Sequence, residues 1–354
     1  MKRRKNARAA EAAAPETQAV PLLSIEDLTV DFRTDDGIVH AVDGVSYAVE
    51  TGEIVGVVGE SGSGKSVTAM SVLGLIRQPP GVVRGGRILF HGEDLRAASA
   101  RRLREIRGNG IAMIFQDPMT ALNPVMRVGQ QIVEALRMHT DGLSRTAARD
   151  RAVELLRMVG VPNPEKRVLQ YPHEFSGGMR QRAMIAMAIA NGPELLIADE
   201  PTTALDVTIQ AQVLELLRTA QRETGAATIL ITHDLGVVAE MADRVVVMYA
   251  GRVVEDADVT SLFAQPRHPY TVGLLGSVPR IDSDDILASV PGSPPNMIQL
   301  PSGCSFHPRC PLARERCRTE EPVLTDIGGR KSACHFHDEL RAADTEHLFA
   351  VESR

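Results

Sequence analysis

Apolar and polar positions alternate in the first part of the chain, and this pattern predicts β-strands. Residues 22–32, 39–49 and 53–58 are rich in Val and Ile, and the turn segments 35–37 and 51–52 separate them. Runs of β-branched residues bounded by Asp and Gly are typical of strands joined by turns. We therefore expect three successive strands, the last of which leads into a glycine-rich loop.

Helical patterns follow the third strand. Residues 67–76 have helical spacing of apolar positions and end at the breaker sequence QPPG of residues 78–81. Residues 128–161 also have helical periodicity, with many charges, whereas residues 195–198 and 228–232 are short apolar runs that favour buried strands. Strands that alternate with helices in this way predict an α/β fold.

The character of the chain changes after about residue 261. Six prolines lie between residues 266 and 295, and no long periodic segment follows. We expect three parts: a disordered tail at residues 1–21, a main domain at residues 22–261 and a small C-terminal domain at residues 262–354. The glycine-rich loop occurs once, and the chain has no internal repeat.

Composition and charge narrow the function classes. Hydrophobic residues make up 44% and charged residues 24% of the chain, as in ordinary globular proteins. The net charge of -6 gives no basic footprint, and no nucleic-acid-binding motif occurs, so we expect no nucleic acid partner. No apolar run reaches the roughly 18 residues of a membrane span, so membrane contact would come through partner proteins. The basic N-terminus lacks a hydrophobic signal region; a solvated tail and a weak contact with anionic lipid are the alternatives.

The glycine-rich loop has the pattern of a phosphate-binding loop. Residues 59–66 read GESGSGKS and match G-x-x-x-x-G-K-[ST] between a strand and a helix. Backbone N–H groups of such a loop close around phosphates at the positive end of the helix. Lys65 should reach the β- and γ-phosphates of ATP, and the Ser66 hydroxyl should bind Mg²⁺. The expected nucleotide-binding residues here are Gly59, Ser61, Gly62, Gly64, Lys65, Ser66 and Val67.

Two later strand ends carry candidate hydrolytic groups. The apolar run LLIA ends in Asp199 and Glu200, where an α/β sheet exposes functional side chains. Asp199 would lie on the metal side, and Glu200 could orient or deprotonate the attacking water. His233 follows the run 228–232, and in this context it would contact the γ-phosphate and its developing charge.

These elements, together with SGGMRQ at residues 176–181, resemble the ATP-binding cassette (ABC) family. The resemblance implies a P-loop NTPase cassette with a RecA-like core, an antiparallel β subdomain and a helical signature subdomain. It implies that Ser176, Gly177 and Gly178 open a helix aimed at ATP held by the opposite subunit. Met179 departs from the family, which more often has Gln there, and this raises the hypothesis that the two ATP sites of the pair differ.

Other family positions follow residue by residue. Gln116 in IFQDP looks like the Q-loop glutamine, which touches Mg²⁺ or water, and Asp206 in TALD matches the D-loop. Phe32 ends the first strand and is the candidate aromatic that stacks on adenine, with core packing as the alternative. The resemblance thus assigns Glu200, His233, Lys65 and Gln116 to catalysis and Ser66, Gln116 and Asp199 to Mg²⁺.

A narrower resemblance extends almost to the end of the chain. HPYTVGLL at residues 268–275, FQDPMTALNP at residues 115–124 and a Cys-bearing tail look like the ATPase subunits of dipeptide and oligopeptide importers, which include nickel-uptake relatives. The resemblance implies a second, homologous ATPase subunit, two transmembrane permeases and an extracytoplasmic peptide-binding protein. It also implies a peripheral location at the cytoplasmic face of the cell (inner) membrane.

All four cysteines lie in the tail, and they predict a metal site. They are separated by five, six and sixteen residues, and reduced thiols clustered in this way favour a metal over disulfides. Four thiolates suit a [4Fe–4S] cluster or tetrahedral Zn²⁺; the spacing lacks a paired C-x-x-C, and the resembled family has been associated with an iron–sulfur cluster here, so we favour [4Fe–4S]. Unligated buried thiols are the alternative. The expected ligands are Cys304, Cys310, Cys317 and Cys334, and His307, His335 or His337 could replace one of them.

The resulting hypothesis is an ATPase that drives peptide import. Two ATPases would form a head-to-tail sandwich, ATP would close it, and hydrolysis would reopen it and move the permeases. One rival is a soluble, non-transport ABC ATPase, although these commonly have two cassettes or a coiled-coil insert. Another is a metal-sensing protein that uses ATP only as a conformational ligand, against which Asp199, Glu200 and His233 argue.

Overall fold

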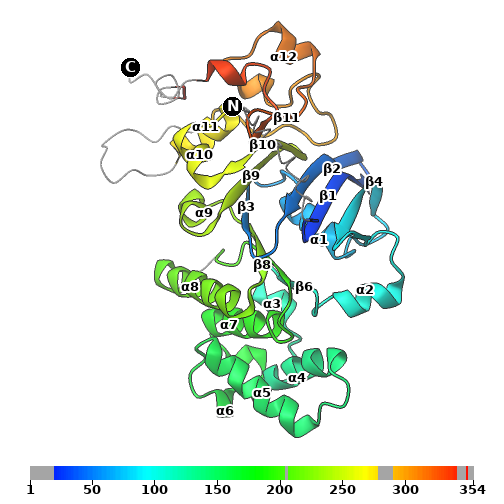
Figure 1. Ribbon diagram of the computed structural model, residues 1–354, viewed down its shortest axis with the longest axis vertical. Coiled ribbons are helices and arrows are strands. Elements are labelled where there is room, and N and C mark those ends of the chain that lie inside the picture. Colours follow the sequence, from blue (N-terminus) through cyan, green and yellow to red (C-terminus); the bar gives the residue numbers. More distant parts are fainter. Residues whose placement is uncertain (1–19, 204–205, 278–289, 341–347, 350–354) are drawn as a thin grey trace, which may run out of the picture.

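The computed structural model describes residues 20–203, 206–277, 290–340 and 348–349. Two β-sheets form the middle of the molecule, a group of helices lies at one end, and the described residues after 261 lie at the other end (Figure 1). The predicted tail falls outside the described residues except at residues 20–21. In the ranges that are described, no helix is both long enough and apolar enough to cross a bilayer.

The smaller sheet is antiparallel and has the strand order β2-β1-β4-β5. The predicted strands at residues 22–32 and 39–49 are confirmed as β1 and β2, which extend toward each other and pair Thr34 with Gly37 around a tight hairpin turn. The strands are β1 (Leu23–Thr34), β2 (Gly37–Val49), β4 (Gly81–Phe90) and β5 (Glu93–Asp94). This sheet forms the expected antiparallel β subdomain.

The larger sheet has eight strands in the order β11-β12-β10-β9-β3-β8-β7-β6. The five strands from β9 to β6 are parallel, and the other three are antiparallel to their neighbours. The predicted apolar runs form its buried centre, because a parallel sheet is covered on both faces. The strands are β3 (Ile54–Val58), β6 (Ile111–Ile114), β7 (Leu195–Asp199), β8 (Ala227–Ile231), β9 (Arg244–Tyr249), β10 (Arg252–Asp258), β11 (Thr325–Asp326) and β12 (Lys331–Ser332).

The helices differ in detail from the predicted patterns. Helix α1 (Lys65–Val72) begins inside the glycine loop, two residues before the predicted start, and ends near Gly74 rather than at residue 76. The helical segment 128–161 contains two helices, α4 (Val128–His139) and α5 (Arg145–Met158). The turn between them contains Gly142, whose φ of 74° interrupts a helix, and the Ser144 side chain caps α5.

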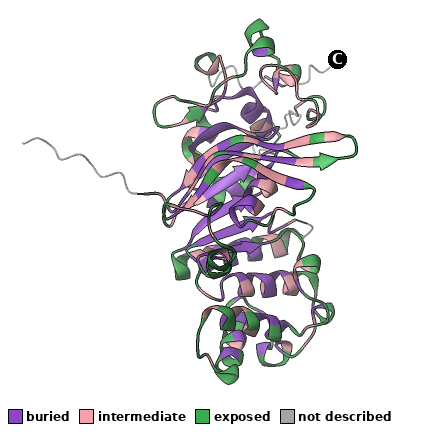
Figure 2. Cartoon of the chain, turned by 90° about the vertical axis from the view of Figure 1, so that its right-hand side faces the viewer, coloured by how far each residue is buried: buried purple, intermediate pink, exposed green. Residues whose placement is uncertain are grey.

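The remaining helices complete the layers. Helices α4, α5 and α7 pack on one another in the described chain and form the helical end that Figure 1 draws below the sheets. Buried positions face inward along them and exposed positions face outward (Figure 2). The helices whose bounds have not yet been given are α2 (Ala100–Ile106), α3 (Pro118–Ala121), α6 (Pro164–Arg167), α7 (Gly177–Ala188), α8 (Val207–Thr224), α9 (Leu235–Met241), α10 (Val259–Ala264), α11 (Pro269–Gly276) and α12 (Glu315–Thr319). The 3₁₀ turns are η1 (Pro172–Glu174), η2 (His307–Arg309) and η3 (His337–Glu339).

The described residues after 261, called the C-terminal segment below, are joined closely to the main domain. Strand β12 pairs with β10 and so extends the large sheet. Tyr270 and Phe306 lie in one buried cluster with Val58 and Val245 of the main domain. The expected boundary at residue 261 falls within α10, so sheet and core both continue past it.

Candidate active site

The phosphate loop connects β3 to α1 and depends on glycine. Gly59, Gly62 and Gly64 have φ of 152°, 78° and 99°, values that L side chains rarely adopt. A Cβ atom at Gly59 would lie 2.1 Å from the Met248 carbonyl oxygen, and one at Gly64 would lie 2.5 Å from the Ala41 carbonyl oxygen. Larger residues at these two positions would therefore push the loop out of its conformation.

Lys65 lies across the loop. Its Nζ donates hydrogen bonds to the carbonyl oxygens of Gly59 (2.7 Å) and Glu60 (2.9 Å) and to Ser63 Oγ (3.3 Å). Burial lowers the pKa of Lys65, and the nearby carboxylates, Glu200 first among them, oppose this shift. The ammonium is thus held at the centre of the loop, where the predicted phosphate contact requires it.

Ser66 and Asp199 come together from distant parts of the sequence. The Ser66 hydroxyl donates a 2.9 Å hydrogen bond to Asp199 Oδ1. Burial raises the pKa of Asp199, while the hydrogen bond from Ser66 acts in the opposite direction. A hydroxyl and a carboxylate side by side are oxygen donors of the kind that Mg²⁺ prefers, so this pair fits the cation predicted from the sequence.

Glu200 lies at the centre of the residues that the sequence predicts to act in hydrolysis. Its carboxylate accepts hydrogen bonds from Gln116 Nε2 (2.7 Å) and Thr203 Oγ1 (2.8 Å), and His233 Nδ1 lies 3.6 Å away. Gln116 follows β6, Glu200 follows β7 and His233 follows β8, because parallel strands bring their carboxyl ends to one edge. The three predicted side chains are therefore brought together. Thr203 was not among the predicted residues.

Glu200 has a lowered pKa and a left-handed backbone conformation. Burial acts to raise the pKa of this carboxyl, but the hydrogen bond from Thr203, the His233 imidazole and the Gln116 amide outweigh it and hold the pKa below its ordinary value. Glu200 also has a φ of 45°, a left-handed conformation that costs energy for a residue with a side chain. A carboxylate that stays ionised in a fixed orientation can act as a proton acceptor or orient a water molecule.

The predicted signature residues, at the start of α7, have no bonds to the phosphate loop of this chain in the described residues. Ser176 caps α7 by accepting a hydrogen bond from the Met179 N–H, and Ser176 and Gly177 are exposed. Within the described ranges, no hydrogen bond or ion pair joins Ser176, Gly177 or Gly178 to the phosphate loop. Asp206 accepts a 2.9 Å hydrogen bond from the Ile209 N–H and caps α8. The structure therefore does not bring these residues into this chain's own loop.

Phe32 lies near the end of β1. It pairs with Val39 and Gly81 and is half-buried against the core between the sheets. Val67, in the first turn of α1, packs against the same core. Contact of either residue with nucleotide stays a prediction.

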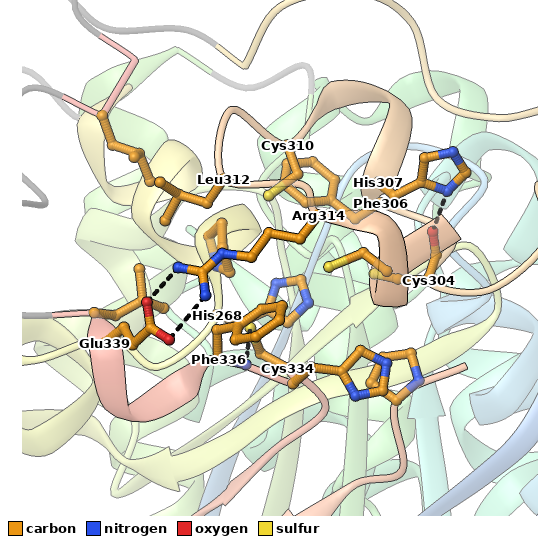
Figure 3. Close-up of a pocket in the computed structure, with 16 residues that line it drawn as sticks. His268, Cys304, Phe306, His307, Cys310, Leu312, Arg314, Cys334, Phe336 and Glu339 are labelled. Carbon is orange, nitrogen blue, oxygen red and sulfur yellow. Dashed lines mark hydrogen bonds and ion pairs between the residues drawn. The ribbon is translucent and has the colours of Figure 1, made fainter. Parts of the chain in front are cut away.

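The four cysteines face one another across a cavity in the C-terminal segment. The cavity has a volume of about 200 Å³, and all four line it together with His268, Phe306 and Arg314 (Figure 3). Burial raises the pKa of Cys304, raises that of Cys310 to about 11 and raises that of Cys334 to about 12. These thiols therefore hold their protons at neutral pH unless a positive centre displaces them.

The cavity does not have the geometry of a single-ion site. In the part of the chain that the structure describes, no three His, Cys, Asp or Glu side chains come together closely enough to hold a metal ion. A tetrahedral zinc site needs four sulfurs at about 2.3 Å from one point. The predicted metal-binding C-terminal domain is therefore not found as a preformed site, because the thiols lie around a cavity instead of converging on one point.

Comparisons with known proteins match both parts of the chain. The family model described as ABC transporter matches residues 42–203, and the one described as oligopeptide/dipeptide transporter, C-terminal region, matches residues 254–317. Among solved structures, the ATP-binding cassette MJ0796 in a post-hydrolysis dimer bound to ADP and Pi has a TM-score of 0.60 and 26% identity, covering 67% of this chain and 98% of that one. The cassette cbiO1 from Clostridium perfringens has a TM-score of 0.57 and 30% identity, over 72% and 95%. Fold and site together define an ABC ATPase cassette.

Curated relatives show to which group of ABC ATPases this chain is similar in sequence. The oligopeptide transport ATP-binding protein OppD of Bacillus subtilis is 54% identical over 86% of both chains. The dipeptide transport ATP-binding protein DppD of Escherichia coli is 52% identical over 89% of this chain and 96% of its own. OppD of Mycobacterium tuberculosis is 54% identical over 90% of this chain, which spans only 52% of that longer protein. The chain belongs to the ABC transporter family, in the group of oligopeptide and dipeptide transport ATP-binding proteins.

Proposed function

We propose that this chain is the ATP-hydrolysing subunit of a di- or oligopeptide importer. The observation that carries the proposal is the convergence of Gln116, Glu200 and His233 beside the Ser66 and Asp199 pair. Relatives named for oligopeptide and dipeptide transport favour peptide over nickel as the cargo. A soluble, non-transport ABC ATPase is less well supported, because the match to the transporter C-terminal region covers residues 254–317.

Each residue of this site has a separate proposed role in binding or hydrolysing ATP. ATP would lie on residues 59–66, with Lys65 toward its terminal phosphates and with Phe32 and Val67 near the base. Mg²⁺ would be held by Ser66, Asp199 and Gln116 and would neutralise phosphate charge when bound. Glu200 would orient or deprotonate the attacking water, since its pKa is held low, and His233 would contact the γ-phosphate.

A second cassette would complete the site. Ser176 and Gly177 are exposed at the start of α7 and have N–H and hydroxyl groups free of the chain's own loop, which supports a role against ATP bound to a homologous partner ATPase. Asp206 would lie at the same interface. Closure and reopening of the pair would move two permease subunits that receive peptide from an extracytoplasmic binding protein, at the cytoplasmic face of the membrane.

A groove after Gln116 is the proposed permease contact. Met126, Arg127, Met138 and Leu169 line a groove of about 760 Å³ on the helical end. Large apolar side chains nearby are exposed, among them Val125 at 79% and Met138 at 66%, and exposed apolar side chains that gather beside a groove mark binding surfaces. Movement of Gln116 with the nucleotide would reach the permeases through this groove.

We further propose that the cysteine cavity holds a [4Fe–4S] cluster and not a zinc ion. A cluster is larger than one ion, and Cys304, Cys310, Cys317 and Cys334 would hold it as thiolates from the walls of the cavity. We assign the ATPase to residues 22–261 and the cluster to residues 262–354. Anaerobically purified complex should contain iron and absorb visible light, and Cys310→Ser should lose both; zinc without iron would overturn this assignment.

The transport proposal is tested with the reconstituted complex. This chain, its partner ATPase, the permeases and the binding protein would be placed in vesicles, and labelled peptide or Ni²⁺ would be supplied with MgATP. ATP-dependent peptide uptake is the expected result. Uptake of Ni²⁺ but not peptide, or failure of the chain to associate with any permease, would favour the alternatives.

A further inference from the structure

Two side chains of the C-terminal segment hold the second residue of the phosphate loop, Glu60. Arg309 donates two parallel hydrogen bonds to the Glu60 carboxylate, of 2.8 and 3.0 Å. The backbone N–H of Glu60 donates to the Tyr270 hydroxyl at 2.8 Å. Both the side chain and the backbone of this loop residue are thus fixed from outside the loop. We call Tyr270 and Arg309 the Glu60 clamp.

Arg309 is itself held in place. Its side chain is only 7% exposed, and Nε donates to the carbonyl oxygen of Pro291 at 2.9 Å. The terminal nitrogens also donate to the carbonyl oxygens of Val290 and Gly292 and to the Tyr249 hydroxyl. A planar guanidinium with acceptors on every side cannot turn without losing several charge-assisted bonds.

Tyr270 is held by aromatic packing. It is fully buried, and its ring centroid lies 4.6 Å from that of Tyr249 and 5.4 Å from that of Phe306. The His268 side chain caps its helix by accepting the Tyr270 N–H. Phe306 and His268 also line the cysteine cavity (Figure 3), so the packing around Tyr270 connects that cavity with the loop residue Glu60.

The Glu60 clamp lies beside the part of the loop that would bind the phosphates of ATP. The carbonyl oxygen of Glu60 accepts a hydrogen bond from Lys65, and the Glu60 carboxylate is close enough to raise the pKa of Lys65 against the effect of burial. Without Arg309, this carboxylate would be an unpaired negative charge beside bound phosphates, and like charges at close range weaken binding. The ion pair therefore both fixes the loop and neutralises Glu60.

We propose that Tyr270 and Arg309 are positioning residues of the phosphate loop, so that the C-terminal segment of this chain sets its affinity for the phosphates of MgATP and MgADP. The inference rests on the proposed function, since it assumes that the loop binds nucleotide. Neither residue touches the reacting atoms. Both act through Glu60.

The test is nucleotide affinity of the full chain by calorimetry. Arg309→Met should weaken MgATP binding about tenfold, the size expected for a lost charge-assisted pair that leaves its partner unpaired. Arg316→Met is the matched control: Arg316 lies in the same segment and pairs with Glu320 at 2.7 Å, and in the described chain it has no hydrogen bond or ion pair with the loop. Its affinity should stay within about twofold of the unaltered chain. Equal losses in the two variants, or no loss in Arg309→Met, would overturn the proposal.

Two milder variants keep the test decisive if Arg309→Met does not fold. Arg309→Lys keeps the charge with fewer hydrogen bonds and should recover part of the affinity. Tyr270→Phe removes only the hydroxyl and should weaken binding about threefold to fivefold with little change in the thermal midpoint. Unaltered affinity in both would contradict the clamp. Failure of the unaltered chain to bind MgATP would instead contradict the proposed function.

Discussion

Gln116 donates a 2.7 Å hydrogen bond from its side-chain amide to the carboxylate of Glu200, and so joins the residues that follow β6 and β7. The carboxylate is oriented by this bond and by the hydrogen bond from Thr203. A nucleotide or cation that attracts Gln116 would remove one of the two hydrogen bonds to Glu200 Oε2. The pair therefore connects occupancy of the site to the group proposed to act on water.

Glu200→Gln should separate binding from hydrolysis. The amide keeps the shape of the side chain and hydrogen-bonding capacity but cannot accept a proton, so MgATP should bind and hold the paired cassettes closed. Turnover at this chain's site should fall by about 10²-fold or more, the contribution typical of a general base. Single-turnover phosphate release measures the effect, and an unchanged rate would exclude Glu200 from the reaction.

Replacement by alanine should destabilise the chain more at Gly64 than at Gly62 of the phosphate loop. Gly64→Ala places a Cβ 2.5 Å from a backbone oxygen and should reduce the free energy of unfolding by more than about 2 kcal/mol. Gly62→Ala is the control, because nothing lies within 4 Å of its added Cβ and only the left-handed conformation is penalised, at about 1 kcal/mol. Urea unfolding without nucleotide compares them, and equal losses would contradict the packing described here.

Glu255 should make stability depend on pH. It is buried in β10, and burial raises its pKa from 4.5 to about 7, against the opposing hydrogen bond from the Arg267 N–H. The folded chain thus keeps a proton that the unfolded chain has lost. Its contribution to stability is complete below pH 4.5 and is lost as the pH rises through about 7, roughly 3 kcal/mol in all.

Glu255→Gln provides the measurement. Gln cannot ionise, so the free energy of unfolding of this variant, relative to the unaltered chain, should rise as the pH increases from 4.5 to 7 and then level off. Urea unfolding across this range checks it. Parallel pH profiles for the two proteins would show that Glu255 is not the titrating group.

Ser176→Arg should affect the partner's site and spare the chain's own loop. The exposed start of α7 would carry a large cation where ATP on the opposite cassette must approach, so MgATP affinity of the isolated chain should not change. In the assembled complex, hydrolysis at the partner's loop should fall about tenfold or more, as expected when donors to developing charge are lost. Loss of binding in the isolated chain would argue against a role across the interface.

The sequence predicts those site residues whose positions depend on local pattern and on the order of the strands. Asp199, Glu200 and His233 end apolar runs, and parallel pairing of β7 and β8 is enough to place them together. The hairpin ends, the break between α4 and α5 and the contact from Thr203 depend on single turns, which periodicity does not resolve.

Contacts between residues far apart in the sequence could not be predicted from local pattern. Glu60 is 210 residues from Tyr270 and 249 residues from Arg309, and no spacing rule connects them. The cysteine spacing indicates a shared site, but it does not show that the thiols line a cavity wall. Such features follow from packing of the C-terminal segment on the large sheet, which depends on tertiary structure.

Phosphate release from MgATP by this chain, assembled with its partner ATPase and permeases, shows whether the loop around Lys65 binds ATP for hydrolysis. We expect steady release that is lost when Lys65 is replaced by Ala, because the loop then lacks its cation, while the assembled complex remains intact. Equal rates for the two complexes, or no phosphate from either while nucleotide stays bound, would contradict it.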